Sequence, residues 1–223
     1  MKKERLDFYG GSISIKYKEK YVYRFFKRFF DIILSLTFLI LFGWFILLMM
    51  LIKFCEDWHN PIYTSIRVGK DGKLIKFHKI RSMIPNADKL KAQLIAEGKN
   101  EADGPAFKMK DDPRITKFGK FLRKTSIDEL PQIWDILVGR LSIVGIRNPL
   151  PKELEEYDNY QKQRLLVKGG LLCLWQIQKN RHQLSFDEWI KLDLDYIEKR
   201  NLWIDFKIIV KGGFNFLFDH SGE

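Results

Sequence analysis

The chain has 223 residues, with 39 Lys and Arg against 28 Asp and Glu, a formal net charge of +11. This length allows one domain of ordinary size, and the charge favours an anionic partner such as lipid headgroups, nucleotide phosphates or nucleic acid. No recognisable nucleic-acid module accompanies the charge, so we expect no nucleic-acid partner. Two cysteines, Cys55 and Cys173, form no pattern, which fits a reduced cytoplasmic setting rather than a disulfide scaffold.

Residues 1–28 mix Lys and Arg with Tyr and Phe directly before a long apolar stretch. Basic and aromatic side chains beside a membrane segment are typical of chain that lies at the headgroups of anionic lipid. We therefore expect residues 1–28 to form a basic interfacial lead-in.

Residues 29–52 read FFDIILSLTFLILFGWFILLMMLI, with Asp31 as their one ionisable residue. As a helix, the uncharged run from Ile32 to Ile52 would extend about 30 Å, the thickness of the hydrocarbon core of a bilayer. The alternative is a core helix of a soluble domain, but such helices rarely stay apolar on every face for so long. The stretch is also too long and too far from the N-terminus for a cleavable signal peptide. It predicts a membrane-embedded helix.

Both flanks of this stretch are basic, with Arg24, Lys27 and Arg28 before it and Lys53 after it. Because Lys and Arg favour the cytoplasmic side, the two ends compete for the same side. A re-entrant helix that bends near its middle and leaves by the face it entered resolves the competition, and a simple span is the alternative.

Within the helix, Gly43 followed by Trp44 is the candidate bend, because glycine weakens a helix interior. Asp31 needs a partner at the membrane boundary, which Arg28 or Lys27 one turn earlier could supply; otherwise it is simply hydrated at headgroup level.

Residues 53–223 predict a small, mostly helical domain with a short β-hairpin, so the fold class is α+β. The expected elements are a hairpin over 61–83 with its turn at 70–73, helices over 86–98 and 152–166, a polar loop at 99–105, an apolar run at 171–177 after a turn at 169–170, a helix from 186 to about 199, and an amphipathic aromatic segment from 202. Ser185 with Glu188 forms a capping box that begins the helix at Phe186. The C-terminal segment is either core or interfacial.

Asp128 and Glu129 are the candidate catalytic residues. Ser126 with Glu129 three residues later also forms a capping box, so Glu129 could serve only to begin a helix. An ionised Asp128 beside Arg123 could instead attack a phosphorus centre, once a metal ion has screened the phosphate charge.

Several motifs appear in a fixed order over most of the chain. They are Lys27-Arg28-Phe-Phe-Asp31, Arg67-Val-Gly69, Lys79-Ile-Arg81-Ser82-Met83, Asp112-Pro-Arg114-Ile-Thr116, Leu122-Arg123-Lys-Thr-Ser126-Ile-Asp128-Glu129-Leu-Pro131-Gln132, Leu174-Trp175-Gln176 and Asp205-Phe-Lys207-Ile. In this order, from Lys27 to about Lys211, the chain resembles the bacterial sugar transferases that begin surface-glycan synthesis, the monotopic polyprenyl-phosphate phosphoglycosyl transferases, in their short form.

The resemblance implies a re-entrant membrane helix, with the catalytic domain over 53–223 on the cytoplasmic face of the bacterial inner membrane. It implies transfer of a sugar 1-phosphate from a UDP-sugar to undecaprenyl phosphate with release of UMP, the first membrane step of capsule or exopolysaccharide assembly. Asp128 would be the nucleophile that forms a covalent phosphosugar-enzyme, and Glu129 would hold Mg²⁺. The residues expected to bind phosphate are Arg123, Arg147, Lys79 and Arg81.

Three places depart from the pattern of the family. Gly43-Trp44 replaces Ser-Pro, Gly145-Ile-Arg147-Asn148-Pro149 replaces Gly-Pro-Arg-Pro, and Gly169 to Cys173 replaces Pro-Gly-Ile-Thr-Gly. Loss of these prolines predicts less rigid loops and altered nucleotide or sugar recognition. We expect an active enzyme, with a non-catalytic membrane adaptor for glycan-synthesis enzymes as the alternative. The sugar is not specified, and a homodimer is left open.

Overall fold

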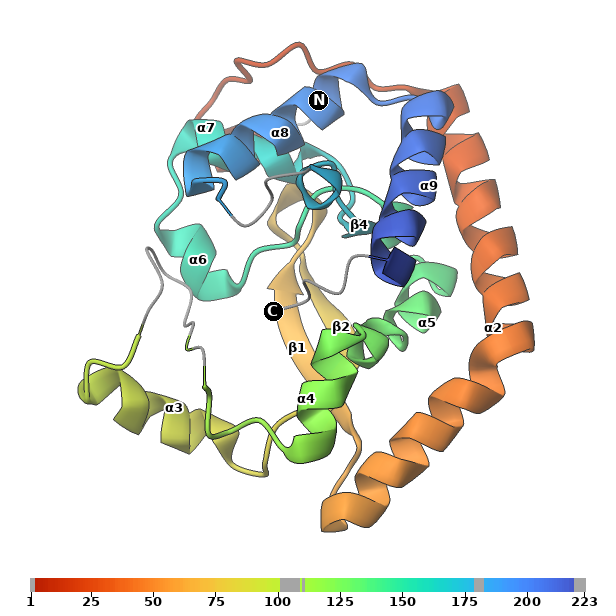
Figure 1. The fold of residues 1–223 in the computed structure, drawn as a ribbon. Helices are drawn as coiled ribbons and strands as arrows, with labels where there is room; N and C mark the ends of the chain where they lie inside the picture. The colour runs from red at the N-terminus through yellow and green to blue at the C-terminus, as the bar shows by residue number, and fades with distance from the viewer. Residues whose placement is uncertain (1–2, 101–108, 110, 179–182, 219–223) are drawn as a thin grey trace.

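The computed structural model describes residues 3–100, 109, 111–178 and 183–218, and it has an α+β fold, as predicted. In chain order (Figure 1) its elements are α1 Lys3–Phe8, α2 Tyr21–Asp57, β1 Ile62–Val68, η1 Lys70–Gly72, β2 Leu74–Ile80, α3 Ala87–Ala96, α4 Lys117–Lys124, η2 Ile127–Glu129, α5 Gln132–Leu137, β3 Ser142–Val144, α6 Pro151–Glu155, α7 Asn159–Lys162, η3 Gln163–Leu166, β4 Gly170–Leu172, η4 Trp175–Ile177, α8 Phe186–Lys199 and α9 Leu202–Phe218, where η marks short 3₁₀ helices.

Helix α2 has 37 residues and begins eight residues before the apolar stretch of 29–52. Its backbone stays helical through Gly43 and Trp44. Figure 1 shows its axis turning in the lower half, so that the helix curves round one side of the domain. The indole Nε1 of Trp44 donates to the carbonyl of Leu41 within the same helix at 2.9 Å.

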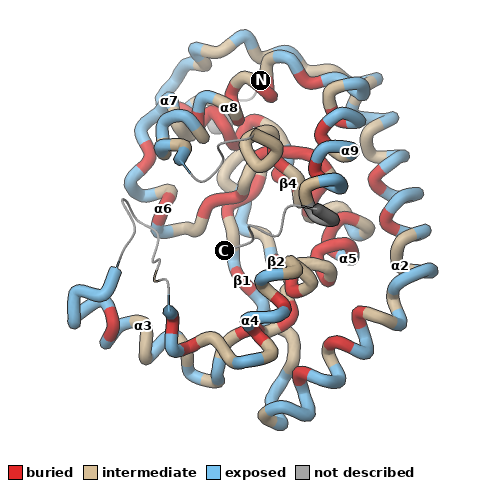
Figure 2. Tube along the Cα trace, viewed as in Figure 1, coloured by how far each residue is buried: buried red, intermediate tan, exposed pale blue. Residues whose placement is uncertain are grey.

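One face of α2 packs on the domain while the other is exposed, as the alternating colours along the tube in Figure 2 show. Ile46 and Met49 are buried, whereas Ile40, Trp44 and Leu47 are each about two-thirds exposed. Only 17% of the most apolar window of the helix is buried, and its mean hydropathy is 2.7. A core helix would be enclosed, so this helix is not one. Its length and composition are sufficient to cross a membrane.

Polar side chains hold the N-terminal part of α2 to the domain. Lys27 forms an ion pair with Asp205 of α9 at 2.6 Å, and Arg28 donates to the carbonyls of Ile136 and Leu137 at 2.6 and 2.7 Å. These carbonyls end α5, where free acceptors and the helix dipole favour a cation. The two cations that the sequence suggested as partners of Asp31 therefore bind α9 and α5 of the domain instead.

Asp31 is buried and accepts hydrogen bonds from the hydroxyl of Ser142 at 3.1 Å and the backbone N–H of Ile143 at 3.0 Å. Both donors belong to β3. Asp31 is therefore neither hydrated at headgroup level nor directly paired with Arg28 or Lys27, because a strand distant in sequence provides its partners.

The C-terminal end of α2 is attached to the same domain. Lys53 is fully buried and contacts Glu56 at 2.6 Å and Thr116 at 3.3 Å. Four residues after Lys53, the carboxylate of Asp57 accepts from both terminal nitrogens of Arg81, at 2.8 and 2.6 Å. Bidentate pairing of this kind fixes direction as well as distance. Both ends of α2 are thus bonded by polar contacts to one domain.

The predicted β-hairpin is confirmed, with β1 and β2 antiparallel and Ile62 opposite Ile80. A second pair, β3 with β4, is parallel. Gly145 and Gly170 lie where these strands meet, and a Cβ on Gly170 would fall 2.0 Å from the backbone nitrogen of Gly145. Residues 169–172, predicted as a turn and an apolar run, form strand β4 and its lead-in.

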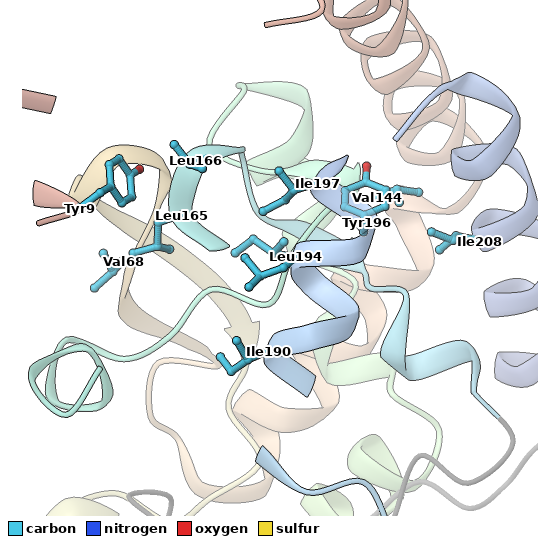
Figure 3. Close-up of a cluster of buried hydrophobic side chains, with 11 residues drawn as sticks. Tyr9, Val68, Val144, Leu165, Leu166, Ile190, Leu194, Tyr196, Ile197 and Ile208 are labelled. Atoms are coloured by element: carbon cyan, nitrogen blue, oxygen red, sulfur yellow. The ribbon is translucent and has the colours of Figure 1, made fainter. Parts of the chain in front are cut away.

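The main hydrophobic core lies between η3, α8, α9 and the end of β1 (Figure 3). It includes Leu165, Leu166, Ile190, Ile197 and Ile208, all essentially buried. The helix predicted over 86–98 is confirmed as α3, and the capping box of Ser185 and Glu188 is confirmed at α8. A single helix over 152–166 is wrong, because three short helices occupy that range. Most of the polar loop predicted at 99–105 lies outside the described residues.

Residues 6–20, expected at the lipid interface, pack partly on the domain. Tyr9 is buried in the main core and its hydroxyl donates to Asp71 at 2.9 Å. Ser14 and Ile15 donate to the side chain of Gln163. This segment therefore links the hairpin turn to η3 before the chain enters α2.

Candidate functional site

Asp128 and Glu129 lie on η2, a single 3₁₀ turn between α4 and α5. Ser126, just before it, has a φ of 53°, in the left-handed region, and its side chain makes no cap hydrogen bond. The capping box predicted for Ser126 and Glu129 is therefore wrong. Thr116 is the residue that caps α4, by accepting from the N–H of Gly119 at 2.9 Å. With no cap to form, the Glu129 carboxylate is available for other contacts.

Asp128 is buried, with 7% of its surface exposed. Loss of water raises the pKa of its carboxyl to about 6, and the neighbouring Glu129 charge acts in the same direction. The positive charges of Lys79 and Arg123 oppose this rise. Asp128 is thus a poorly hydrated carboxylate that two cations keep ionisable near neutral pH, as a nucleophile requires.

Glu129 forms an ion pair with Lys79 of β2, with 2.6 Å between Oε1 and Nζ. Burial works against ionisation of Glu129, but Lys79, Arg147 and Arg67 outweigh it and lower the pKa of this carboxyl. About a third of the Glu129 side chain remains exposed. Strand β2 and η2 are adjacent, so the hairpin supplies the cation and the 3₁₀ turn supplies both acids.

Two further cations expected to bind phosphate lie near this pair of acids. Arg123, at the end of α4, donates from Nε to the hydroxyl of Ser82 at 2.9 Å. Arg147 follows β3, with its guanidinium 5.8 Å from the centre of the Trp189 ring. Within the described residues, neither guanidinium forms an ion pair with a carboxylate. The structure therefore brings together Asp128, Glu129, Lys79, Arg123 and Arg147.

Arg81 has different contacts. Besides Asp57, it donates to the carbonyls of Asn60 and Met83 at 2.8 and 2.9 Å. Its guanidinium joins the end of α2 to the exit of β2. Phosphate binding by Arg81 stays a prediction. The hydrogen bonds that its guanidinium makes instead connect two elements of the fold.

Hydrogen bonds fix the loop that carries Arg147, in place of the missing prolines. Asn148 is buried, and its amide Nδ2 donates to the carbonyl of Val68 at 2.7 Å. The N–H of Val68 donates in turn to the carbonyl of Pro149 at 2.9 Å. The loop is held against the end of β1.

Sequence reasoning did not assign a site role to Arg67, whose guanidinium donates to the carbonyl of Asn148 at 3.3 Å. The sequence feature that could have identified Arg67 as a site residue is its position near the end of a hairpin strand, in the Arg67-Val-Gly69 motif. His78, bonded at 2.7 Å to the buried Asp135, was also not identified. That contact connects β2 to α5, and so supports the strand that carries Lys79.

The fit of the site to Mg²⁺ can be judged from its donors. No group of three or more His, Cys, Asp or Glu that could hold a metal occurs in the described part of the chain. Mg²⁺ commonly uses one or two carboxylates together with substrate phosphates, retaining water for the remaining positions. The adjacent carboxylates of Asp128 and Glu129 fit that donor set, provided a substrate supplies phosphate oxygens.

Comparison with known proteins gives a consistent result. A family model described as bacterial sugar transferase matches residues 22–219. The galactosyl transferase CpsE of Streptococcus agalactiae is 40% identical over 210 residues, which are 93% of this chain and 46% of that protein. The undecaprenyl-phosphate galactose phosphotransferase of Salmonella typhimurium is 38% identical over 193 residues, 84% of this chain and 40% of that one. The chain spans about half or less of the length of these two relatives.

A shorter relative is covered over most of its length. The exopolysaccharide production protein ExoY of Rhizobium meliloti is 35% identical over 188 residues, which are 83% of this chain and 82% of that protein. The range that the family model matches, 22–219, contains every candidate site residue.

The free energy of unfolding should depend on pH through the ionisation of the buried Asp128 carboxyl. In the folded protein its pKa is near 6, above the usual 3.8, so the stability that this group contributes declines as pH rises from about 4 to about 6. We expect Asp128→Asn to be more stable than the wild type at pH 7.5, by up to about 3 kcal/mol, and little different at pH 4. The measurement is thermal unfolding in detergent at several pH values.

The control is Asp187→Asn, an exposed carboxylate at the start of α8. Its effect should be small and independent of pH. A stabilisation by Asp128→Asn that is absent, or that shrinks as pH rises, would contradict a desolvated Asp128.

Proposed function

The chain belongs to the bacterial sugar transferase family, and from this premise we propose that it transfers a sugar 1-phosphate from a UDP-sugar to undecaprenyl phosphate, releasing UMP. The observation that carries the proposal is the desolvated Asp128 between Lys79 and Arg123, one residue from Glu129. The names of two similar proteins, a UDP-galactose-lipid carrier transferase and an undecaprenyl-phosphate galactose phosphotransferase, support the same substrate classes.

The reaction proceeds in two displacements. A carboxylate oxygen of Asp128 attacks the phosphorus that bears the sugar, forming an oxygen–phosphorus bond as the bond to UMP breaks. A phosphate oxygen of undecaprenyl phosphate then attacks the same phosphorus, and Asp128 leaves as a carboxylate. A nucleophile with little water around it loses little hydration on attack, and fixed cations stabilise the charge that develops on the phosphoryl oxygens.

Each neighbouring side chain has a defined part in this scheme. Lys79 holds Glu129 and favours ionisation of Asp128, while Arg123 and Arg147 supply donors for phosphate oxygens. When bound by Glu129, Mg²⁺ would screen the negative charge of the diphosphate. Arg123 is in turn oriented by Ser82, so its direction does not depend on the substrate.

We also propose that α2 is a re-entrant helix in the bacterial inner membrane, bent near Gly43, with the domain on the cytoplasmic face. The attachment of both helix ends to one domain supports this. Asp31 binds β3 and Asp57 binds Arg81, while Ile46 and Met49 pack between these points. If α2 crossed the bilayer, parts of this domain would have to follow it through the hydrocarbon core.

This topology suits the chemistry of the acceptor. Undecaprenyl phosphate has a charged head at the interface and a long tail in lipid, so its nucleophilic oxygen stays at the boundary. Helix α2 exposes apolar side chains such as Trp44 and Leu47 on the side away from the domain. The site is thereby held at the depth of the lipid phosphates.

UMP release tests the reaction. Purified protein is incubated with Mg²⁺, undecaprenyl phosphate and a panel that includes UDP-galactose and UDP-glucose. We expect release with at least one donor, at least about 10³-fold slower in Asp128→Asn because the nucleophile is absent. We expect Lys79→Gln to be slower by about 10²-fold.

Lys120→Gln is the matched control, since this exposed lysine lies on α4 with Arg123 but makes no contact with the acids. It should retain wild-type activity. No UMP from any donor would favour the non-catalytic adaptor, and release that survives Asp128→Asn would contradict Asp128 as the nucleophile.

The topology is tested by labelling single cysteines. Tyr21→Cys and His59→Cys, each in a Cys55→Ser background, place an exposed thiol just outside either end of the apolar stretch, whereas native Cys173 is buried. We expect a membrane-impermeant maleimide to label both positions in inverted vesicles and neither in sealed right-side-out vesicles. Labelling of the two positions from opposite sides would establish a span instead. Detergent-opened vesicles, in which both must label, provide the control.

A further inference from the structure

Arg67 is a cation near the site that lacks an anionic partner. Its guanidinium reaches the carbonyl of Asn148 at 3.3 Å, a long contact, and its Nε is shielded from solvent without any hydrogen-bond partner. In the described part of the chain, no carboxylate lies within ion-pair distance of it. A buried cationic donor left unsatisfied is costly, and proteins rarely retain one unless something else binds it.

The neighbours of Arg67 increase this cost. Arg147 directly precedes Asn148, whose carbonyl Arg67 contacts. Burial and the positive charge of Arg147 both lower the pKa of Arg67. Both arginines act electrostatically on Glu129, but Glu129 is already paired with Lys79. Two guanidinium groups therefore face one region of the site without a carboxylate of their own.

The scaffold fixes the backbone that carries Arg67. It lies in β1, where the register pairs it with Ile75. The loop beyond it is bonded back to Val68 through Asn148 and Pro149. The backbone beside Arg67 is therefore held by the same bonds that hold the Arg147 loop, and the guanidinium contacts this loop at the carbonyl of Asn148.

We propose that Arg67 and Arg147 form a second anion subsite, which binds a phosphate group other than the one that Asp128 attacks. This inference rests on the proposed function, because a diphosphate donor and a phosphate acceptor each bring one such group. A guanidinium fork suits phosphate oxygens, and a bound phosphate would give Arg67 Nε its missing acceptor. Arg67 is thus a substrate-positioning residue.

That phosphate has two chemical sources. It is either the nucleoside phosphate that leaves as UMP or the phosphate monoester of the lipid acceptor. Kinetics separates them, since a change at Arg67 alters the KM for whichever substrate brings the phosphate. Loss of a charged hydrogen bond predicts a rise of about 10- to 100-fold in that KM, with a smaller change in kcat.

The test uses Arg67→Gln, which removes the charge, and Arg67→Lys, which keeps the charge but not the fork. Thermal unfolding of the full protein in detergent is measured without ligand and with UMP or inorganic phosphate. Without ligand, we expect Arg67→Gln to be as stable as the wild type or more so, because repulsion from Arg147 is relieved. The stabilisation by UMP or phosphate should be lost in Arg67→Gln and partly retained in Arg67→Lys.

Lys76→Gln is the matched control, since this lysine lies on β2 of the same hairpin and is exposed. It should keep wild-type ligand stabilisation and KM values. If Arg67→Gln instead unfolds at a lower temperature without ligand and keeps the wild-type response to UMP and phosphate, Arg67 is structural and the subsite is refuted. The unfolding measurement needs no turnover, so it can succeed or fail independently of UMP release.

Discussion

Polar attachment of α2 at both ends is the constraint on which the remaining structure depends. A helix with so much exposed apolar surface would otherwise be free to tilt in the bilayer or to separate from its domain. Arg28 on the carbonyls that end α5, Asp31 on β3, and Asp57 on Arg81 remove this freedom. Because α5 follows η2 directly and Arg81 ends the hairpin strand that carries Lys79, the contacts that fix the membrane helix also fix the height of the acids. The contacts that place the apolar helix on the domain therefore also align the site.

The site itself is electrostatically strained in the absence of ligand. Asp128 is held with little water, and Arg67, Arg123 and Arg147 have no carboxylate partner in the described residues. Such an arrangement lowers stability, and substrate phosphates together with a divalent cation would relieve it. Lys79 limits this strain, since its ion pair with Glu129 neutralises one of the two adjacent acids. The buried Arg164 and Asp193 of the main core differ from Arg67 in that their charges pair directly with each other, although Arg164 Nε and Asp193 Oδ1 also lack a hydrogen-bond partner among the described residues.

Local sequence signals predicted the elements whose causes are local. The hairpin followed from alternating residues around Asp71-Gly72, and α8 from the box of Ser185 and Glu188. The same box at Ser126 and Glu129 failed, because a partner distant in sequence, Lys79, binds the Glu129 carboxylate. The break in the helix predicted over 152–166 did have a local signal, a cap by Asp158 on α7 that was not recognised. The partners of Asp31 had no local signal, since strand β3 provides them. The Arg67-Val-Gly69 motif marked Arg67 itself but not its unsatisfied Nε, because that environment depends on the distant loop after β3.

Direct detection of the phosphosugar on Asp128 is the measurement that tests the central claim, that a carboxylate held at the membrane boundary is the nucleophile. The protein is mixed with Mg²⁺ and its UDP-sugar without undecaprenyl phosphate, quenched rapidly in acid, and analysed by intact-protein and peptide mass spectrometry. The account predicts an added mass equal to one sugar phosphate on the peptide that contains Asp128, accompanied by an equimolar burst of UMP, and loss of the adduct when lipid acceptor is added. An enzyme that turns over with both substrates, yet shows neither adduct nor burst with the donor alone, would contradict it.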